Sequence, residues 1–218
     1  MISAVVPWSP GCPYRERVLP WVLDRLRGLV DEVVVGETSG QWCKAAAVAN
    51  GLERASGDVL IVHDADVFIE DSAWVEECVG ALEEHAWASP HDWVNRLTSM
   101  TSNERVMAGS NPWAEPRNRH EAFLGGGIVV LRRSTYEDCP LDRRYVGWGQ
   151  EDESWANALA TLHGKPFRGD RALWHLFHPP QERINRRWGS TESMELCAEY
   201  EAATGNVEAM RTLIGAVR

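Results

Sequence analysis

Val59-Leu-Ile-Val-His-Asp-Ala-Asp66 is an apolar run of strand length that ends in two aspartates, Asp64 and Asp66. Residues i and i+2 of a strand point to the same face, so both carboxylates can converge where the strand ends. Ligands of α/β proteins bind at this carboxyl edge of a parallel sheet, and two carboxylates there suit Mg²⁺ or Mn²⁺. A turn with solvated acids is the plainer interpretation, because Asp-x-Asp alone is a common pattern.

Strand and helix patterns alternate on both sides of this stretch. Apolar runs predict strands at residues 2–7, 32–35 and 59–63, and helical spacing predicts helices at 14–27, 44–55 and 72–85. This βαβαβα order predicts an α/β domain with a mainly parallel central sheet flanked by helices. Further strands are expected at 125–131 and 172–177, and further helices up to about 163, at 190–203 and at 207–217. The Pro-rich, polar residues 87–120 predict long loops that are functional or mobile.

The composition is that of a folded, acidic protein. The 218 residues are 44% hydrophobic and 25% charged, with a net charge of −10. This balance argues against a nucleic-acid backbone or an anionic membrane as the main partner. The sequence shows neither an apolar run of membrane-spanning length nor a signal-peptide pattern. Five cysteines without a CxxC pair fit neither a disulfide framework nor a zinc ribbon, so we expect reduced thiols and a cytoplasmic location.

Tryptophan is unusually frequent, with 11 Trp against 4 Tyr and 4 Phe. Trp21, Trp74 and Trp155 fall on predicted helices, so we expect them in the core. Others are expected in loops near the ligand edge or beside the candidate site residues, where they form a candidate carbohydrate surface: Trp8, Trp42, Trp113, Trp148, Trp174 and Trp188.

Two further motifs carry groups suited to catalysis. In Gly147-Trp-Gly-Gln-Glu-Asp152 the glycines permit a tight loop, and Trp148 offers a flat face for a sugar ring. Glu151 and Asp152 begin a helix, whose dipole favours the ionised carboxylate that a general base needs; ordinary helix capping is the alternative. His175 and His178 can complete a divalent metal site begun by a carboxylate, although a lone histidine is more often structural.

Together these motifs resemble the GT-A-fold nucleotide-sugar glycosyltransferases, family-2-like enzymes with a galactosyltransferase-type carboxy-terminal motif. The matching pieces cover residues 2–180 in the family's order: Lys44-Ala-Ala-Ala-Val-Ala-Asn50-Gly51, Val62-His-Asp64-Ala-Asp66, Gly125-Gly-Gly-Ile, Gly147-Trp-Gly-Gln-Glu-Asp152 and His175/His178. The resemblance implies a Rossmann-like GT-A fold. It also implies Mn²⁺- or Mg²⁺-dependent transfer of a hexosyl or N-acetylhexosaminyl group from a nucleoside diphosphate sugar, with a UDP-sugar favoured. The acceptor, whether glycan, protein or small molecule, is not named.

The resemblance assigns roles by position. Asp64 and Asp66 would contact the ribose and the metal, Asp66 being the more direct ligand. His178 would complete the metal site, with His175 in the place of a further ligand. Asp152 would be the catalytic base, and Glu151 would bind a sugar hydroxyl. The donor pocket would be lined by Pro7, Trp8, Glu37, Lys44, Gly126 and Trp148, with Asn50 either lining it or only packing.

The domain division follows from the same resemblance. Residues 1–86 would form the nucleotide-binding half, 87–180 the acceptor or catalytic half, and 181–218 a helical extension packed on the same domain. Two arginine-containing segments are candidate phosphate contacts or lids, or else solvated surface: Arg117, Arg119 and His120, and Arg183, Arg186, Arg187 and Trp188.

Asp152 favours an inverting transfer, because similar retaining enzymes usually lack this aspartate. A retaining transferase of the same fold and a non-catalytic carbohydrate-binding protein are the alternatives. A nucleotidyltransferase is disfavoured, since Ser9-Pro-Gly-Cys-Pro13 lacks the Gly-rich, basic phosphate loop of that class.

Overall fold

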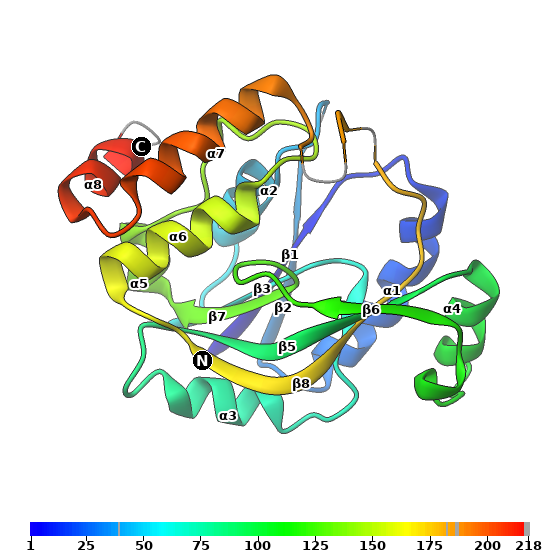
Figure 1. Cartoon of the computed structure of the whole chain (residues 1–218). Coiled ribbons are helices and arrows are strands. Elements are labelled where there is room, and N and C mark those ends of the chain that lie inside the picture. The colour runs from blue at the N-terminus through cyan, green and yellow to red at the C-terminus, as the bar shows by residue number, and fades with distance from the viewer. Residues whose placement is uncertain (39, 182, 186–187, 216–218) are drawn as a thin grey trace.

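The computed structural model describes residues 1–38, 40–181, 183–185 and 188–215 (Figure 1). Arg186 and Arg187, two of the predicted lid residues, lie outside these described residues. The strands are β1 (Ile2–Trp8), β2 (Glu32–Glu37), β3 (Val59–His63), β4 (Val67–Phe68), β5 (Trp87–Leu97), β6 (Arg117–Glu121), β7 (Ile128–Arg132) and β8 (Phe167–His175). The helices are α1 (Pro13–Arg27), α2 (Lys44–Leu52), α3 (Trp74–Ala81), α4 (Met100–Met107), α5 (Arg133–Asp138), α6 (Glu151–His163), α7 (Thr191–Ala203) and α8 (Val207–Gly215), with a short 3-10 turn η1 (Pro112–Ala114).

The predicted alternation of the first half is confirmed. β1 lies between β2 and β3 and is parallel to both. Side chains of β1 alternate between the two faces of the sheet: Ala4 and Val6 enter one core cluster and Val5 enters the other. The three strands therefore end at one edge, where Asp64 follows β3.

The second half differs from the prediction, because the sheet is mixed rather than mainly parallel. Its order is β2-β1-β3-β7-β5-β8-β4, with β6 paired to β5. β7 runs antiparallel to both β3 and β5, whereas β8 is parallel to β5. The fold class is nevertheless the expected one, a single α/β domain with helices on both faces of the sheet (Figure 1).

The region expected to form loops, residues 87–120, contains β5, α4 and β6. Pro90 misled the prediction, because it lies at a register shift of β5 between Ser89 and His91. A bulge is one of the few places where a strand accommodates proline, which cannot donate a hydrogen bond to its neighbour. β5 pairs with β7 and β6 on one side and β8 on the other, so it is a central strand of the sheet.

Helices cover both faces of the sheet, and the tryptophans expected on helices pack in the core between helices and sheet. Helices α1 and α3 contribute to one core cluster, which contains Trp74, and α2, α5, α6, α7 and α8 contribute to the other, which contains Trp155. Trp21 is half-buried against the first cluster, so the three tryptophans expected in the core do pack there. Trp8 and Trp174, expected at the carbohydrate surface, are instead buried strand residues.

The C-terminal helices α7 and α8 pack on α6 and on each other (Figure 1). Their buried side chains, among them Leu196, Tyr200 and Met210, belong to the same core cluster as Trp155 of α6. In the described part of the chain, no helix combines the length and the apolar character needed to cross a membrane.

Candidate functional site

The candidate site lies where β3 ends, and strand pairing brings its parts together. Asp64 and Asp66 follow β3, and the short β4 that comes next pairs antiparallel with the end of β8, Val67 opposite His175. The Leu176 N–H donates to the carbonyl oxygen of Asp66 at 2.8 Å. Residues about 110 positions apart in the sequence are thereby fixed side by side.

Asp66, His175 and His178 form a compact group of possible metal ligands. One ligand atom from each lies within 4.8 Å of the others. The Oδ2 atom of Asp66 is 3.2 Å from Nε2 of His178, and its Oδ1 is 3.8 Å from Nε2 of His175. The side chain of Asp66 is buried, so water does little to screen its charge.

Both histidine rings are turned so that the same nitrogen faces Asp66. Nδ1 of His175 is 2.8 Å from the Leu176 carbonyl oxygen, and Nδ1 of His178 is 2.7 Å from that of Pro179. A carbonyl oxygen only accepts hydrogen bonds, so Nδ1 carries the proton and Nε2 of the neutral ring keeps its lone pair. Burial lowers the pKa of His175 to about 4, which keeps that ring neutral. One carboxylate and two imidazole nitrogens fit a divalent metal such as Mn²⁺.

Arg15 is a site residue that the sequence analysis missed. Its Nε donates to Oδ2 of Asp66 at 2.8 Å, and its terminal nitrogen lies 3.2 Å from Nε2 of His178. The available signal was its position in the first turn of α1, the helix that follows β1. Because β1 and β3 are parallel neighbours, this turn lies at the same edge as Asp66.

A second cluster lies next to the metal group and centres on Lys44. Its Nζ is 2.7 Å from Oδ1 of Asp64 and 2.7 Å from Oδ1 of Asp152. The Lys44 side chain is buried, while the two carboxylates are each about 30% exposed. Lys44, expected only to line the donor pocket, thus links the first aspartate of the Asp-x-Asp motif to the candidate base.

The glycine turn Gly125–Gly127 makes room for Asp152. A Cβ atom at Gly125, which has a φ of +85°, would collide with the Asp152 carbonyl oxygen, and one at Gly126 would lie 3.1 Å from Asp152 Oδ2. The Gly127 N–H donates to Oδ2 of Asp64 at 3.2 Å. Gly126, which was expected to line the pocket for the nucleotide-sugar donor, therefore lies directly beside the candidate base Asp152.

Lys44→Met should destabilise the fold by about 3 kcal/mol, because it leaves two partly buried carboxylates without their counter-charge. Burial raises the pKa of Asp152 and Lys44 opposes this rise, so its loss raises that pKa further. When the pKa of a carboxyl is higher in the folded than in the unfolded state, the unfolding free energy of the protein falls as pH rises. The destabilisation by Lys44→Met should therefore be larger at pH 8 than at pH 5. Urea unfolding at both pH values measures this.

The matched control is Lys165→Met, since Lys165 is the chain's other lysine and is exposed. We expect it to change the unfolding free energy by less than about 0.5 kcal/mol. Equal stability of the two variants would contradict the structural role of the Lys44 contacts.

The acidic loop, Gly147–Asp152, carries Trp148 and Glu151, and the Glu151 carboxyl lies close enough to Lys44 for their charges to interact. Oε2 of Glu151 is buried and has no hydrogen-bond partner among the described residues. Burial, helped by the charge of Asp152, raises the pKa of Glu151 to about 8. A neutral carboxyl can donate a hydrogen bond, which suits the expected contact with a sugar hydroxyl.

Neighbouring segments hold the loop in place. The Gly147 N–H donates to the Trp42 carbonyl oxygen at 2.6 Å. A Cβ at Gly189 would collide with the Trp148 carbonyl oxygen, so the segment leading into α7 packs directly on the loop. The Arg183 guanidinium stacks 5.0 Å from the Trp148 ring centroid. Two of the predicted lid and platform residues therefore contact each other.

Comparison with known protein families matches the pattern of glycosyl transferase family 2 to residues 23–134, just over half of the chain. The chain belongs to glycosyl transferase family 2. The matched region includes Lys44, Asp64, Asp66 and Gly126. The segment Gly147–Asp152, His175 and His178 lie beyond it, so the match supports neither the expected galactosyltransferase-type motif nor a role for these residues.

Solved structures show the fold of this family 2 chain. A crystal structure of glucosyl-3-phosphoglycerate synthase from Mycobacterium tuberculosis with Mn²⁺, UDP and glucosyl-3-phosphoglycerate has a TM-score of 0.52 and 14% identity, covering 98% of this chain and 80% of that one. The same enzyme with phosphoglyceric acid has a TM-score of 0.51 and 15% identity, with the same coverages. Its complex with Mn²⁺, UDP-glucose and phosphoglyceric acid has a TM-score of 0.50 and 16% identity, covering 98% and 79%. These likenesses show the GT-A fold; no curated protein matched the chain.

The residues expected at the nucleotide end lie at the ends of β1 and β2. Pro7 and Trp8 are buried and pair with Gly36 and Glu37, whereas the Glu37 side chain is exposed. The Glu37 N–H donates to Oδ1 of Asn50 at 3.1 Å, which gives Asn50 a structural contact. Within the described residues, no hydrogen bond or ion pair links Pro7, Trp8 or Glu37 to the metal group.

The basic residues of the middle segment lie on β6 rather than in a loop. Arg117 stacks 5.0 Å from the exposed Trp113 ring, and Arg119 stacks 4.3 Å from Trp93. The Arg96 Nε donates to His120 Nε2 at 3.2 Å. These contacts hold the β6 side chains against neighbouring aromatic and basic groups. The segment with Arg117, Arg119 and His120 is therefore a paired strand and not the expected irregular lid.

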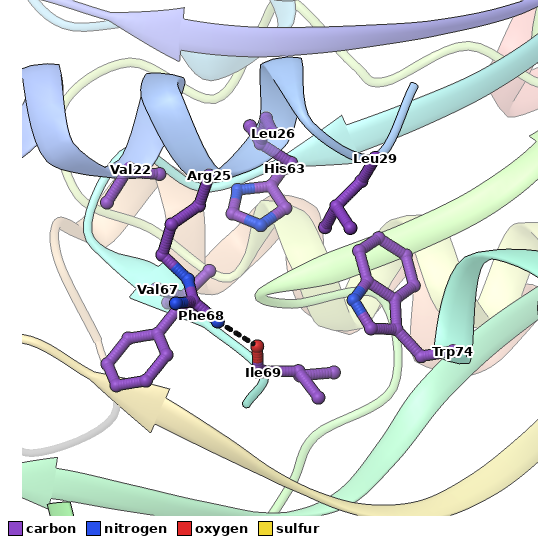
Figure 2. Close-up of a pocket in the computed structure, with 9 residues that line it drawn as sticks. All are labelled: Val22, Arg25, Leu26, Leu29, His63, Val67, Phe68, Ile69 and Trp74. Atoms are coloured by element: carbon purple, nitrogen blue, oxygen red, sulfur yellow. Dashed lines mark hydrogen bonds between the residues drawn. The ribbon is translucent and has the colours of Figure 1, made fainter. Parts of the chain in front are cut away.

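A small cavity lies behind the site, between α1, β3 and β4 (Figure 2). Its volume is about 10 Å³, the room of one water molecule at most. His63 lies on its wall, and the Arg25 side chain donates to the Ile69 carbonyl oxygen at 2.9 Å across it (Figure 2). It is therefore too small to hold a ligand larger than water.

Proposed function

We propose that this family 2 chain is a metal-dependent glycosyltransferase that transfers a sugar from a nucleoside diphosphate sugar, most simply a UDP-sugar, to an acceptor hydroxyl with inversion. One observation carries the proposal: Asp66, His175 and His178 bring their ligand atoms within 4.8 Å of one another, and Asp64, two residues before Asp66 in the chain, is joined through Lys44 to Asp152. The Mycobacterium tuberculosis structures that share the fold contain Mn²⁺ with UDP or UDP-glucose, which supports the choice of donor and metal.

Asp66, His175 and His178 would hold the metal, Mn²⁺ or Mg²⁺. A bound divalent ion offsets the negative charge that develops on the departing diphosphate. These residues supply only one negative charge of their own, so their affinity for the ion depends on the anionic donor. A bound divalent ion would also let a protein with a net charge of −10 bind an anionic substrate, because the ion offsets the repulsion between them.

Asp152 would accept the proton of the acceptor hydroxyl. It lies in the first turn of α6, where the helix dipole stabilises a negative charge, and Lys44 further favours the ionised form. Lys44 contacts Oδ1, while Oδ2 faces the glycine turn, where Gly126 leaves room beside it. Protonated Glu151 would donate to a sugar hydroxyl, and the ring of Trp148 would stack on the sugar.

Calorimetry with UDP, with and without Mn²⁺, tests the proposal. We expect UDP to bind in the presence of Mn²⁺ and the binding to disappear when EDTA is added, because a divalent ion offsets the charge of the diphosphate. Binding of sugars alone, unaffected by metal or UDP, would instead support the carbohydrate-binding alternative.

A panel of nucleotide sugars then identifies the donor through metal-dependent hydrolysis. Proton NMR of the first product distinguishes the two stereochemical outcomes. Inversion is expected if Asp152 activates the acceptor directly, because in a single displacement the acceptor attacks the anomeric carbon from the face opposite the leaving group. Retention would favour the retaining transferase and remove the basis for the role of Asp152.

A further inference from the structure

We propose that Arg15 is a built-in countercation of the metal site: it must leave Asp66 and His178 when a divalent ion binds, and it then binds the diphosphate of the donor. The first step depends only on the metal site. The second step rests on the proposed function. Together they predict that metal and nucleotide bind cooperatively.

The contacts of Arg15 occupy the atoms that a metal needs. Oδ2 of Asp66 and Nε2 of His178 are 3.2 Å apart. With the single ring proton on Nδ1, which faces the Pro179 carbonyl oxygen, both atoms are acceptors. Two such lone pairs repel each other unless a cation or a donor lies against both. The Arg15 guanidinium does so, with nitrogens 2.8 Å from Asp66 and 3.2 Å from His178.

A divalent ion and this guanidinium cannot share the two atoms. Metals of this kind bind oxygen and nitrogen ligands at about 2.1 Å, so the ion would use the same lone pairs and lie against the positive guanidinium. The Arg15 side chain is 26% exposed, against 7% for Asp66, so it has an open path to solvent. Arginine is therefore the group that moves, while Asp66 and His178 stay.

The acidic side chains of Glu16 on α1 and Glu104 on α4 already have partners of their own. Glu16 accepts the Gly11 N–H at 2.8 Å, and Glu104 pairs with Arg17 at 2.7 Å. Arg96, on β5 opposite His175, adds another positive charge near Asp66. A displaced Arg15 would therefore lie near a second arginine, and an anion with two phosphate groups could pair with it.

Titration with Mn²⁺ alone, followed by the EPR signal of the free ion, tests the first step. We expect Arg15→Met to bind Mn²⁺ about tenfold more tightly than the wild type, because no cation has to leave. Arg17→Met is the matched control, since Arg17 lies on the same helix in an exposed ion pair, and it should behave as wild type. Wild-type or weaker Mn²⁺ binding by Arg15→Met would overturn the proposal.

The same titration with UDP present tests the second step. In the wild type, UDP should strengthen Mn²⁺ binding about tenfold or more, and this coupling should shrink in Arg15→Met. Undiminished coupling in that variant would overturn the diphosphate role. Arg15→Lys provides a second folded variant with the charge kept, and circular dichroism checks each fold.

A His178→Ala titration separates this inference from the proposed function. If His178→Ala leaves Mn²⁺ binding unchanged, the metal site itself is wrong, and the proposed function falls with it. If His178→Ala weakens Mn²⁺ binding while Arg15→Met does not alter it, only the role of Arg15 is refuted.

Discussion

Asp66→Asn should reduce sugar transfer on the order of 10³-fold and weaken Mn²⁺ binding in parallel, since a metal supplies several kcal/mol of charge stabilisation in the transition state. The amide keeps the shape of the carboxylate but removes its charge. Asp66 is the one carboxylate in the group with His175 and His178, so this substitution removes the only anionic ligand of the group. Transfer rates and Mn²⁺ titration on the same preparations measure both effects.

Asp71→Asn is the control for this substitution. Asp71 lies a few residues beyond Asp66, and its carboxylate is exposed and paired with Arg171. We expect this variant to keep wild-type transfer and metal affinity. Transfer by Asp66→Asn within tenfold of the wild type would show that the chemistry does not depend on this ligand group.

Local patterns made the centre of the fold and the metal group predictable. The apolar run ending in Asp64 and Asp66 marks both a buried strand and its ligand-facing end, because burial and strand polarity determine both. His175 and His178 could be found because a short apolar stretch, Ala172-Leu-Trp174, comes directly before His175 at the end of β8. The structure places Asp66, His175 and His178 together, and their role as metal ligands stays a prediction.

Arg15 and the position of Lys44 could not be predicted in this way. Arg15 contacts Asp66 across 51 positions, and Lys44 contacts Asp152 across 108. No periodicity indicates which of many basic side chains will face a given carboxylate, since this depends on how two helix ends are placed over the sheet. Pairwise charge contacts of this kind follow only from the tertiary packing.

The middle of the chain shows a different reason for failure. Pro90 and the polar residues around β5 indicate a loop by local propensity, yet bulges and pairing on both sides override that propensity. The tryptophans show the same limit. Trp174 follows three residues of mixed polarity and is fully buried, whereas Trp148 is half-buried in the acidic loop, with Arg183 over its ring.

Asp152 is the residue on which the chemistry of transfer, as distinct from donor binding, is expected to depend. It is not one of the candidate metal ligands, and its contacts are to Lys44 and the glycine turn. Burial raises its pKa, so the wild-type rate should fall on acidification at a pH above about 4, the pKa of an ordinary aspartate. Removing its charge should therefore affect turnover and leave the metal in place.

Asp152→Asn should lower kcat by about 10²- to 10⁴-fold, the usual contribution of a general base, with little change in Mn²⁺-dependent UDP binding. The amide oxygen can still accept the Lys44 hydrogen bond, so a loss of turnover would reflect the missing base rather than a collapsed site. Glu153→Gln, the next residue of α6, is the control and should transfer normally. If Asp152→Asn keeps the wild-type kcat and its rate falls on acidification at the same pH as that of the wild type, another group takes the proton. If kcat and UDP binding fall together, Asp152 holds the donor instead, because a base that acts only in the transition state changes kcat alone.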